Sequence, residues 1–238
     1  MAKGRRTHPM IEHGHATHTG LQRAHNEDSY WADTERGLWL VADGMGGPAR
    51  GEAASAIALE TTVAAIDAGI PLPDAFRRAG AAVLAHPAQH GAAAPMGSTL
   101  AALKLNNGGF AVARIGDSRI YLWQDNRLAR LPHARPPIDA EIASGEPPPA
   151  PSRNRATQAL GITPTLELDT QPVTGPCVPG MQFLLCSDGL TEELDDARIG
   201  AIVSRTDLAA QECVDHLLLA ALDGGGRDNI TAVLVRVR

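Results

Sequence analysis

Two adjacent acidic residues follow an arginine near the start of this sequence, in the stretch RAHNEDSYW (residues 23–31). Glu27 and Asp28 are neighbours, and carboxylates so close raise each other's pKa unless cations neutralise them. A solvated loop is one interpretation of this stretch. The other is a site in which the acids hold metal cations and Arg23 binds an anion beside them.

Further aspartates stand at the ends of apolar runs that have the character of buried strands. Taken alone, an aspartate before Gly or Ser is a favoured turn residue. Strand ends of one sheet system can meet at one rim, so we expect these aspartates to join Glu27 and Asp28. Three follow the runs LWLVA, FAVARIG and FLLCS and one precedes ITAVLVRV, and the set is Asp43, Asp117, Asp188 and Asp228.

The types of ligand indicate which cation such a site would hold. Oxygen ligands without His or Cys favour Mg²⁺ or Mn²⁺ over zinc, and more than two acids suggest at least two ions. A pair of ions suits in-line attack on phosphorus, because it can lower the pKa of a shared water and hold phosphoryl oxygens. Arg23 would then bind the same phosphate through its planar guanidinium.

Other catalytic motifs are absent from the sequence. It contains neither a Walker P-loop nor HExxH, and the glycines of GMGGPARGE lack the spacing of a dinucleotide-binding fingerprint, which favours a tight turn. Ser98 and Ser187 lie outside any GxSxG elbow, so a serine nucleophile has little support.

The elements that must position these acids alternate irregularly along the chain. The sequence predicts pairs of strands rather than a regular alternation of strands and helices. This pattern indicates one mixed domain and argues against a doubly wound parallel sheet. Apolar runs predict strands at 38–42, 98–105, 110–123, 181–187 and 230–237, with 98–105 and 110–123 consecutive antiparallel strands around an NNGG turn. Helical spacing predicts helices at 50–68, 73–86, 191–205 and 208–223.

Composition narrows the classes of partner. The chain of 238 residues is 44% hydrophobic, enough for a real core, and its net charge of −6 gives no footprint for nucleic acid or anionic lipid. No apolar run is long enough to span a bilayer or to act as a signal sequence. Three cysteines without a CxxC pair fit reduced thiols and a cytoplasmic protein, and they are Cys177, Cys186 and Cys213.

Two segments stand apart from the expected elements. Residues 1–18 are polar and carry four histidines, of which His13 and His15 could bind a transition metal, although no further ligands complete a site. We expect a mobile or edge segment there. Residues 132–154 are rich in proline and predict a flap or long surface loop.

The ordered motifs of this chain resemble those of the PP2C (PPM) family of metal-dependent protein phosphatases, in their short bacterial form. The matching stretches run from about residue 19 to the C-terminus, so residues 19–238 would form the phosphatase domain. They are RAHNEDS, LVADGMGG with GEAAS, GSTL, ARIGDSRIYL, QALG, FLLCSDGLTEEL and GGRDNITAVLV.

The resemblance implies an α+β fold, an α-β-β-α sandwich of two antiparallel sheets flanked by helices. It also implies hydrolysis of phosphoserine and phosphothreonine by a water activated at two Mn²⁺ or Mg²⁺ ions. Asp43 would bridge the ions with the Gly44 carbonyl as a further ligand, Asp188 and Asp228 would complete one shell, and Glu27 would serve the other. Asp28 would orient ligands or water, and Asp117 with Asp188 would hold a third, weaker ion.

Departures from the family pattern concern the surface that meets the substrate. Met45 stands where many members have a candidate acid histidine, so water becomes the expected proton donor. Pro132 replaces the aspartate of a usual DH pair and leaves His133, and Met181 replaces another common aspartate. The metal-binding acids are all present.

Alternative functions remain open at this point. The altered flap would suit a catalytically weak phosphoprotein-binding regulatory module, and a phosphoesterase acting on small molecules or phosphotyrosine is a third interpretation. The family implies phosphorylated protein substrates, an opposing serine/threonine kinase and a monomer, with neither nucleic acid nor membrane as a partner.

Overall fold

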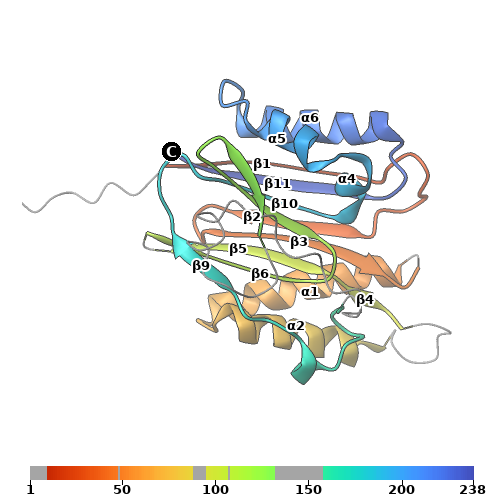
Figure 1. Cartoon of the computed structure of the whole chain (residues 1–238). Coiled ribbons are helices and arrows are strands. Elements are labelled where there is room, and N and C mark those ends of the chain that lie inside the picture. Colours follow the sequence, from red (N-terminus) through yellow and green to blue (C-terminus); the bar gives the residue numbers. More distant parts are fainter. Residues whose placement is uncertain (1–9, 48, 88–94, 107, 132–157) are drawn as a thin grey trace, which may run out of the picture.

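A computed structural model describes residues 10–47, 49–87, 95–106, 108–131 and 158–238 of the chain. Two antiparallel sheets lie face to face, and helices cover the outer face of each sheet (Figure 1). This α-β-β-α arrangement confirms the predicted fold class. The expected flap, residues 132–154, and Pro132 with it, lie outside the described residues.

The first sheet brings together strands from both ends of the chain. Its order is β1-β11-β10-β7-β8, and every neighbouring pair is antiparallel. The strands are β1 (Ile11–His18), β11 (Ile230–Val237), β10 (Gln182–Cys186), β7 (Arg119–Gln124) and β8 (Arg127–Arg130).

The second sheet is built largely from the first half of the chain. Its order is β2-β3-β5-β6-β9, with the short β4 paired to β3, and it too is antiparallel. The strands are β2 (Asp28–Asp33), β3 (Leu38–Met45), β4 (Gly97–Ser98), β5 (Leu100–Asn106), β6 (Gly109–Ile115) and β9 (Val173–Pro176).

Helices cover the outer face of each sheet, as Figure 1 shows. The second sheet is covered by α1 (Arg50–Asp67) and α2 (Leu72–Ala85), and the short 3₁₀ helix η2 (Thr165–Glu167) contacts α2. The first sheet is covered by α4 (Asp188–Glu193), α5 (Asp196–Val203) and α6 (Ala210–Gly224). None of the described helices combines the length and apolar character needed to cross a membrane.

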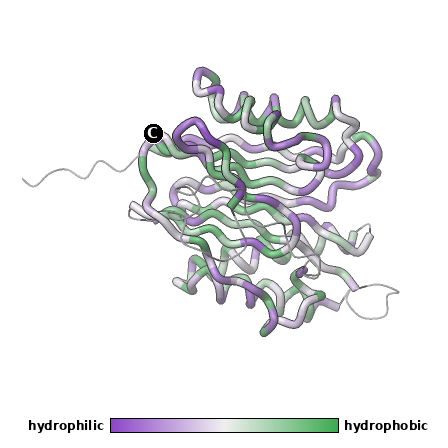
Figure 2. Tube along the Cα trace, viewed as in Figure 1, coloured by the Kyte–Doolittle hydropathy of each residue, from purple (hydrophilic) through white to green (hydrophobic). Residues whose placement is uncertain are grey.

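Three apolar layers hold the sandwich together, and Figure 2 shows the apolar strands at its centre. The middle layer lies between the sheets and includes Trp39, Leu103 and Phe183, which are all fully buried. The outer layers join each sheet to its helices. Because the sheets are covered on both faces, their central strands read as continuous apolar runs and lack a polar alternation.

The N-terminal segment forms part of the first sheet. Of residues 1–18, for which the sequence indicates a mobile or edge segment, residues 11–18 form the edge strand β1, which pairs with β11 along its whole length from Ile11↔Val237 to His18↔Ile230. Gly14 allows this strand to lie close to α6, since a Cβ there would come within 2.5 Å of the Gln211 backbone. Polar composition hid the strand, because an edge strand needs few apolar side chains.

Two other predicted elements are corrected. The helix expected over 191–205 is two helices, since Leu194 is extended and Asp195 caps α5 by accepting a hydrogen bond from Arg198 N at 2.7 Å. The run 110–123 is also divided, because the chain leaves the second sheet after β6 and enters the first sheet at β7. Asp117 lies in this crossing.

The inter-sheet layer generates a prediction for stability. Leu103 is fully buried there, so Leu103→Ala should lower the free energy of unfolding by about 2–5 kcal/mol through lost burial and the cavity that remains. Urea unfolding measures the change. Leu166→Ala is the matched control, because Leu166 is 93% exposed and its truncation should cost less than about 0.5 kcal/mol. Equal losses would contradict this packing.

Candidate metal centre

Strand pairing places two of the acids directly opposite each other. Asp28 at the start of β2 pairs in register with Asp43 on β3. Thr99 holds the backbone of Asp43 from the next strand, accepting a hydrogen bond from Asp43 N at 2.9 Å and donating its own N–H to Asp43 O at 2.8 Å. The Asp28–Asp43 pair is therefore fixed by backbone geometry.

The first sheet supplies two more acids from neighbouring strand ends. Asp188 follows β10 and opens α4, while Asp228 lies just before β11, the partner of β10. Gly189 allows the two ends to approach, because a Cβ there would come within 2.1 Å of the Asn229 carbonyl oxygen. The end of β10 and the start of β11 thus bring Asp188 and Asp228 to the same edge of the first sheet.

Asn229 ties the loop that carries Glu27 to the start of β11. Its side-chain oxygen accepts a hydrogen bond from Glu27 N at 2.8 Å, and its amide nitrogen donates to the carbonyls of Thr19 and His25 at 2.8 and 2.9 Å. Asn229 N also donates to Asp228 Oδ1 at 2.8 Å, so this residue holds both the acid beside it and the N-terminal loop.

Glycines leave room for the Glu27 carboxylate beside β3. A Cβ on Gly51 would lie 1.8 Å from Glu27 Oε2 and 3.0 Å from the Gly44 carbonyl oxygen. These two oxygens therefore lie close to one point, where only glycine leaves space. Gly44 has its own constraint, because a Cβ there would come within 1.9 Å of the Gly51 carbonyl oxygen.

Burial and mutual repulsion together disfavour ionisation of the clustered acids. Burial raises the pKa of Asp43 well above its usual value, and the charges of Asp28, Asp188, Asp117 and Asp228 raise it further. The five aspartates predicted to share a site are therefore in electrostatic contact.

The neighbouring acids show the same effect. Burial, with the charges of Asp188 and Asp228, raises the pKa of Asp28 to about 7. Burial, with Asp117 and Asp228, raises the pKa of Asp188 to about 6. Burial also raises the pKa of Glu27, against the opposing effect of Arg23.

The donor set fits hard divalent cations. The cluster offers only carboxylate and carbonyl oxygens, and Asp188 Oδ1 is buried without a hydrogen-bond partner among the described residues. Such an orphaned acceptor is costly unless a cation or water satisfies it. Within the described part of the chain, no three acidic, histidine or cysteine side chains are already closed around one point. Carboxylates that repel each other need the cation itself to draw them together.

Arg23 lies at the exposed side of this acid cluster. Its Nη2 donates to Asp228 Oδ2 at 2.6 Å, and 56% of its side chain is accessible to solvent. An exposed guanidinium anchored to one of the acids is suited to bind an anion that approaches the cluster. The sequence placed Arg23 beside the acids, but its ion pair with Asp228 emerges only from the fold.

Several residues of the site escaped the sequence analysis. Ser187 Oγ donates to Asp28 Oδ2 at 2.7 Å and accepts from Thr231 N at 2.9 Å, so it orients the buried carboxylate. Thr99 Oγ1 and Ser118 Oγ lie 2.7 Å apart and connect Asp43 to the Asp117 crossing. The sequence gives one signal for this role of Ser187, its position directly before Asp188.

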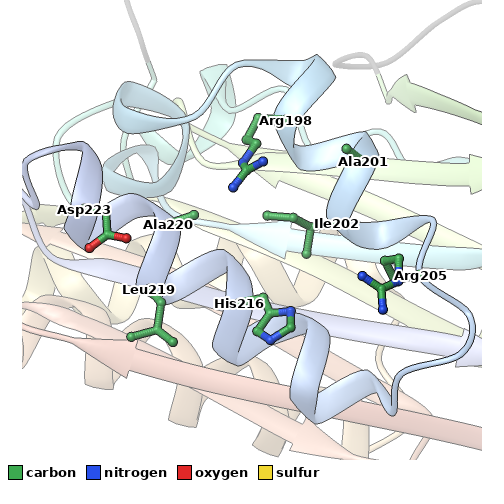
Figure 3. A pocket seen from close by; sticks show the side chains of 8 residues that line it. All are labelled: Arg198, Ala201, Ile202, Arg205, His216, Leu219, Ala220 and Asp223. Carbon is green, nitrogen blue, oxygen red and sulfur yellow. The ribbon is translucent and has the colours of Figure 1, made fainter.

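A hollow lies away from these acids, between α5 and α6 (Figure 3). Arg198, Arg205 and His216 line it together with the exposed side chain of Leu219. Arg205 is already paired with Asp207, Nη2 to Oδ2 at 2.7 Å. None of the predicted site residues borders this hollow, so the chemistry of the acid cluster does not extend to it.

Comparisons with known proteins agree with this geometry. The family model described as Protein phosphatase 2C matches residues 18–223. The serine/threonine protein phosphatase PstP of Mycobacterium tuberculosis is 31% identical over 227 residues, which cover 92% of this chain and 43% of PstP. The chain thus spans less than half the length of PstP. The serine/threonine phosphatase stp of Listeria welshimeri is 30% identical over 237 residues, covering 92% of this chain and 93% of that protein.

A solved structure is similar over almost the whole chain. It is the catalytic domain of serine/threonine protein phosphatase PstP in complex with two manganese ions. The two share 30% sequence identity with a TM-score of 0.77, and the match covers 95% of this chain and 98% of that one.

The raised pKa of Asp188 predicts a pH-dependent stability in the metal-free protein. An acid whose folded pKa lies above its unfolded value costs nothing at low pH, and its penalty grows as pH rises from about 4 to 6. Asp188→Asn removes that penalty. In EDTA, the variant should therefore gain roughly 1–2 kcal/mol over the wild type at pH 7.5, and about a third of that at pH 4.5.

Urea unfolding at the two pH values measures this difference. Asp223→Asn is the control, because Asp223 is exposed on α6 and lies outside the acid cluster. A gain from Asp188→Asn that is the same at both pH values would contradict the electrostatic account.

Proposed function

The chain belongs to the protein phosphatase 2C family, and from this premise we propose that it hydrolyses phosphoserine and phosphothreonine in proteins. The observation that carries the proposal is the convergence of Asp43, Asp28, Asp188, Asp117 and Asp228 in one electrostatically coupled cluster. Two Mn²⁺ or Mg²⁺ ions, when bound, would activate a water for attack on phosphorus and neutralise developing charge.

The acids divide into groups by where they lie. Asp43, at the centre of the cluster, is suited to bridge two ions. The Gly44 carbonyl and Glu27 share the space beside Gly51 and would serve one ion. Asp188 and Asp228, at the ends of paired strands, would serve the other.

The remaining acids would act at the edge of the same site. Asp28 receives a hydrogen bond from Ser187, which suits a role in orienting ligands or water. Asp117 raises the pKa of Asp188, which supports the proposal that these two acids would hold a third ion weakly.

Arg23 would hold the phosphoryl group of the substrate at the open side of the cluster. The guanidinium is partly exposed, and its ion pair with Asp228 keeps it beside the acids. A planar fork can donate two hydrogen bonds to phosphoryl oxygens. Met45, next to Gly44, has no proton to give, so the proton for the leaving alkoxide would come from water.

The substrates would be phosphorylated proteins, and the opposing enzyme a serine/threonine kinase. The family names of the relatives support this class of substrate. We further propose that the chain acts as a monomer in the cytoplasm. The free thiols of Cys177, Cys186 and Cys213 fit a reducing compartment.

The first experiment is release of inorganic phosphate from a phosphothreonine peptide while Mn²⁺ is titrated, with EDTA as the control. The proposal expects release that rises with Mn²⁺ and stops in EDTA. Peptide binding without release at any Mn²⁺ concentration, by protein shown to be folded, would overturn it in favour of the phosphoprotein-binding module. Parallel assays with phosphotyrosine peptide and p-nitrophenyl phosphate separate the phosphoesterase alternative.

Removing one central carboxylate should abolish turnover. Asp43→Asn is expected to lower kcat by at least about 100-fold, because the bridging position loses its charge while the strand pairing with Asp28 stays. Steady-state kinetics in saturating Mn²⁺ give the change, and circular dichroism checks the fold. Asp223→Asn should keep wild-type kinetics, and near-wild-type kcat from Asp43→Asn would sink the assignment.

Removing the phosphate-binding charge should weaken substrate use while leaving the acids intact. Arg23→Ala is expected to lower kcat/KM by roughly 10- to 100-fold, the value of one or two charge-assisted hydrogen bonds. Arg23→Lys keeps the charge without the fork and should lose less. If Arg23→Ala leaves kcat/KM unchanged, Arg23 serves only its ion pair with Asp228.

A further inference from the structure

A buried arginine lies beneath the Asp117 side of the acid cluster. Arg114 is on β6, where it shares a face with Phe110 and Val112 of the inter-sheet layer, and only 9% of the residue is exposed. Its Nη1 donates to the carbonyl oxygens of Gly116 and Ser118 at 3.0 and 3.2 Å. These carbonyls flank Asp117, so Arg114 holds the crossing that carries this acid.

The charge of Arg114 is poorly compensated at close range. Its Nε is buried without a hydrogen-bond partner, and no carboxylate among the described residues forms an ion pair with it. Burial lowers the pKa of Arg114 to about 10, with further lowering by Arg130 and Arg119, so the guanidinium still carries its charge at neutral pH. Asp117 is the nearby carboxylate that favours the charged form.

Two further arginines make this side of the cluster positive. Arg119 and Arg130 lie close enough to lower the pKa of Arg114. Arg119 donates to Tyr121 Oη at 3.0 Å and is 3.6 Å from Asp196 Oδ1, so its charge is partly shared with α5. An uncompensated buried cation is costly, and the field of the clustered aspartates is the available compensation.

The charge of Arg114 could bind an anion from solvent or act on the acids from inside the protein, and the burial of the side chain favours the second role. An anion from solvent would need an accessible guanidinium, as Arg23 offers with 56% of its side chain exposed. Arg114 has its Nε sealed from solvent and its Nη1 committed to two carbonyls. Its charge therefore acts on the acids from within the protein.

We propose that Arg114 is a fixed cation of the metal centre, which positions the Asp117 crossing and opposes the binding of a metal ion at Asp117. The inference rests on the proposed function, because it concerns the same ions. A permanent positive charge beneath Asp117 repels a divalent cation there, and Asp117 is the carboxylate with the largest effect on Arg114. The two principal ions would then bind well and the third weakly.

The test compares Mn²⁺ binding to Arg114→Gln, Arg114→Lys and the wild type, by electron paramagnetic resonance of free Mn²⁺ during titration. Arg114→Gln keeps a donor for the crossing but removes the charge, so the weakest site should tighten by roughly three- to tenfold. Arg114→Lys keeps the charge and should stay within about twofold of wild type. Arg77→Gln is the matched control, because among the described residues Arg77 pairs with Asp74 on the surface of α2.

Each outcome has a definite meaning. Unchanged affinity and stoichiometry in folded Arg114→Gln, or equal tightening in Arg114→Lys, would overturn the role of Arg114 and leave the proposed function intact. No Mn²⁺ binding by the wild type would instead contradict the proposed function itself.

A second measurement decides the matter if Arg114→Gln does not fold. In EDTA, Asp188→Asn should raise the midpoint of thermal unfolding by relieving repulsion. Asp117→Asn should lower it or leave it unchanged, because the fixed cation loses the nearby negative charge that favours its charged form. Equal rises from both variants would show that Arg114 does not compensate Asp117.

Discussion

Repulsion among buried carboxylates is the constraint on which the rest of this structure depends. Asp28, Asp43 and Asp188 all have raised pKa values, because folding removes them from water and places them beside one another. Hydrophobic burial in three layers supplies the free energy that holds them there. Divalent cations bound there, as we propose, would offset this cost, so stability, metal affinity and catalysis would be properties of one cluster.

Both sheets contribute to the scaffold that keeps these acids in place. Asn229 fastens the Glu27 loop, Ser187 orients Asp28, and Thr99 secures the backbone of Asp43. Each of these contacts joins segments that are far apart in sequence. Hydroxyl and amide groups suit this task because they satisfy carboxylates and backbone groups without adding charge.

Positive charge is distributed unequally around the cluster. Arg23 is exposed at the open side, where we propose that it binds a phosphoryl group, whereas Arg114 is buried beneath Asp117. The same side chain would therefore recruit an anion in one place and act as an internal counter-charge in another. Accessibility distinguishes these uses, because 56% of the Arg23 side chain is exposed and only 9% of Arg114.

The sequence by itself identified the family and supplied the acids and the oxygen-only chemistry of the proposed site, because these depend on residue types at the ends of apolar runs. It also predicted most strands and helices, whose apolar periodicity is local. It missed the edge strand β1, the break at Asp195 between α4 and α5, and the passage of Asp117 from one sheet to the other. The break at Asp195 is local, since Asp195 caps the helix by accepting a hydrogen bond from Arg198 N three residues on. Only the tertiary structure decided the pairing of β1, the passage of Asp117, the Arg23–Asp228 pair and the buried charge of Arg114, because each depends on contacts between distant segments that no local pattern records.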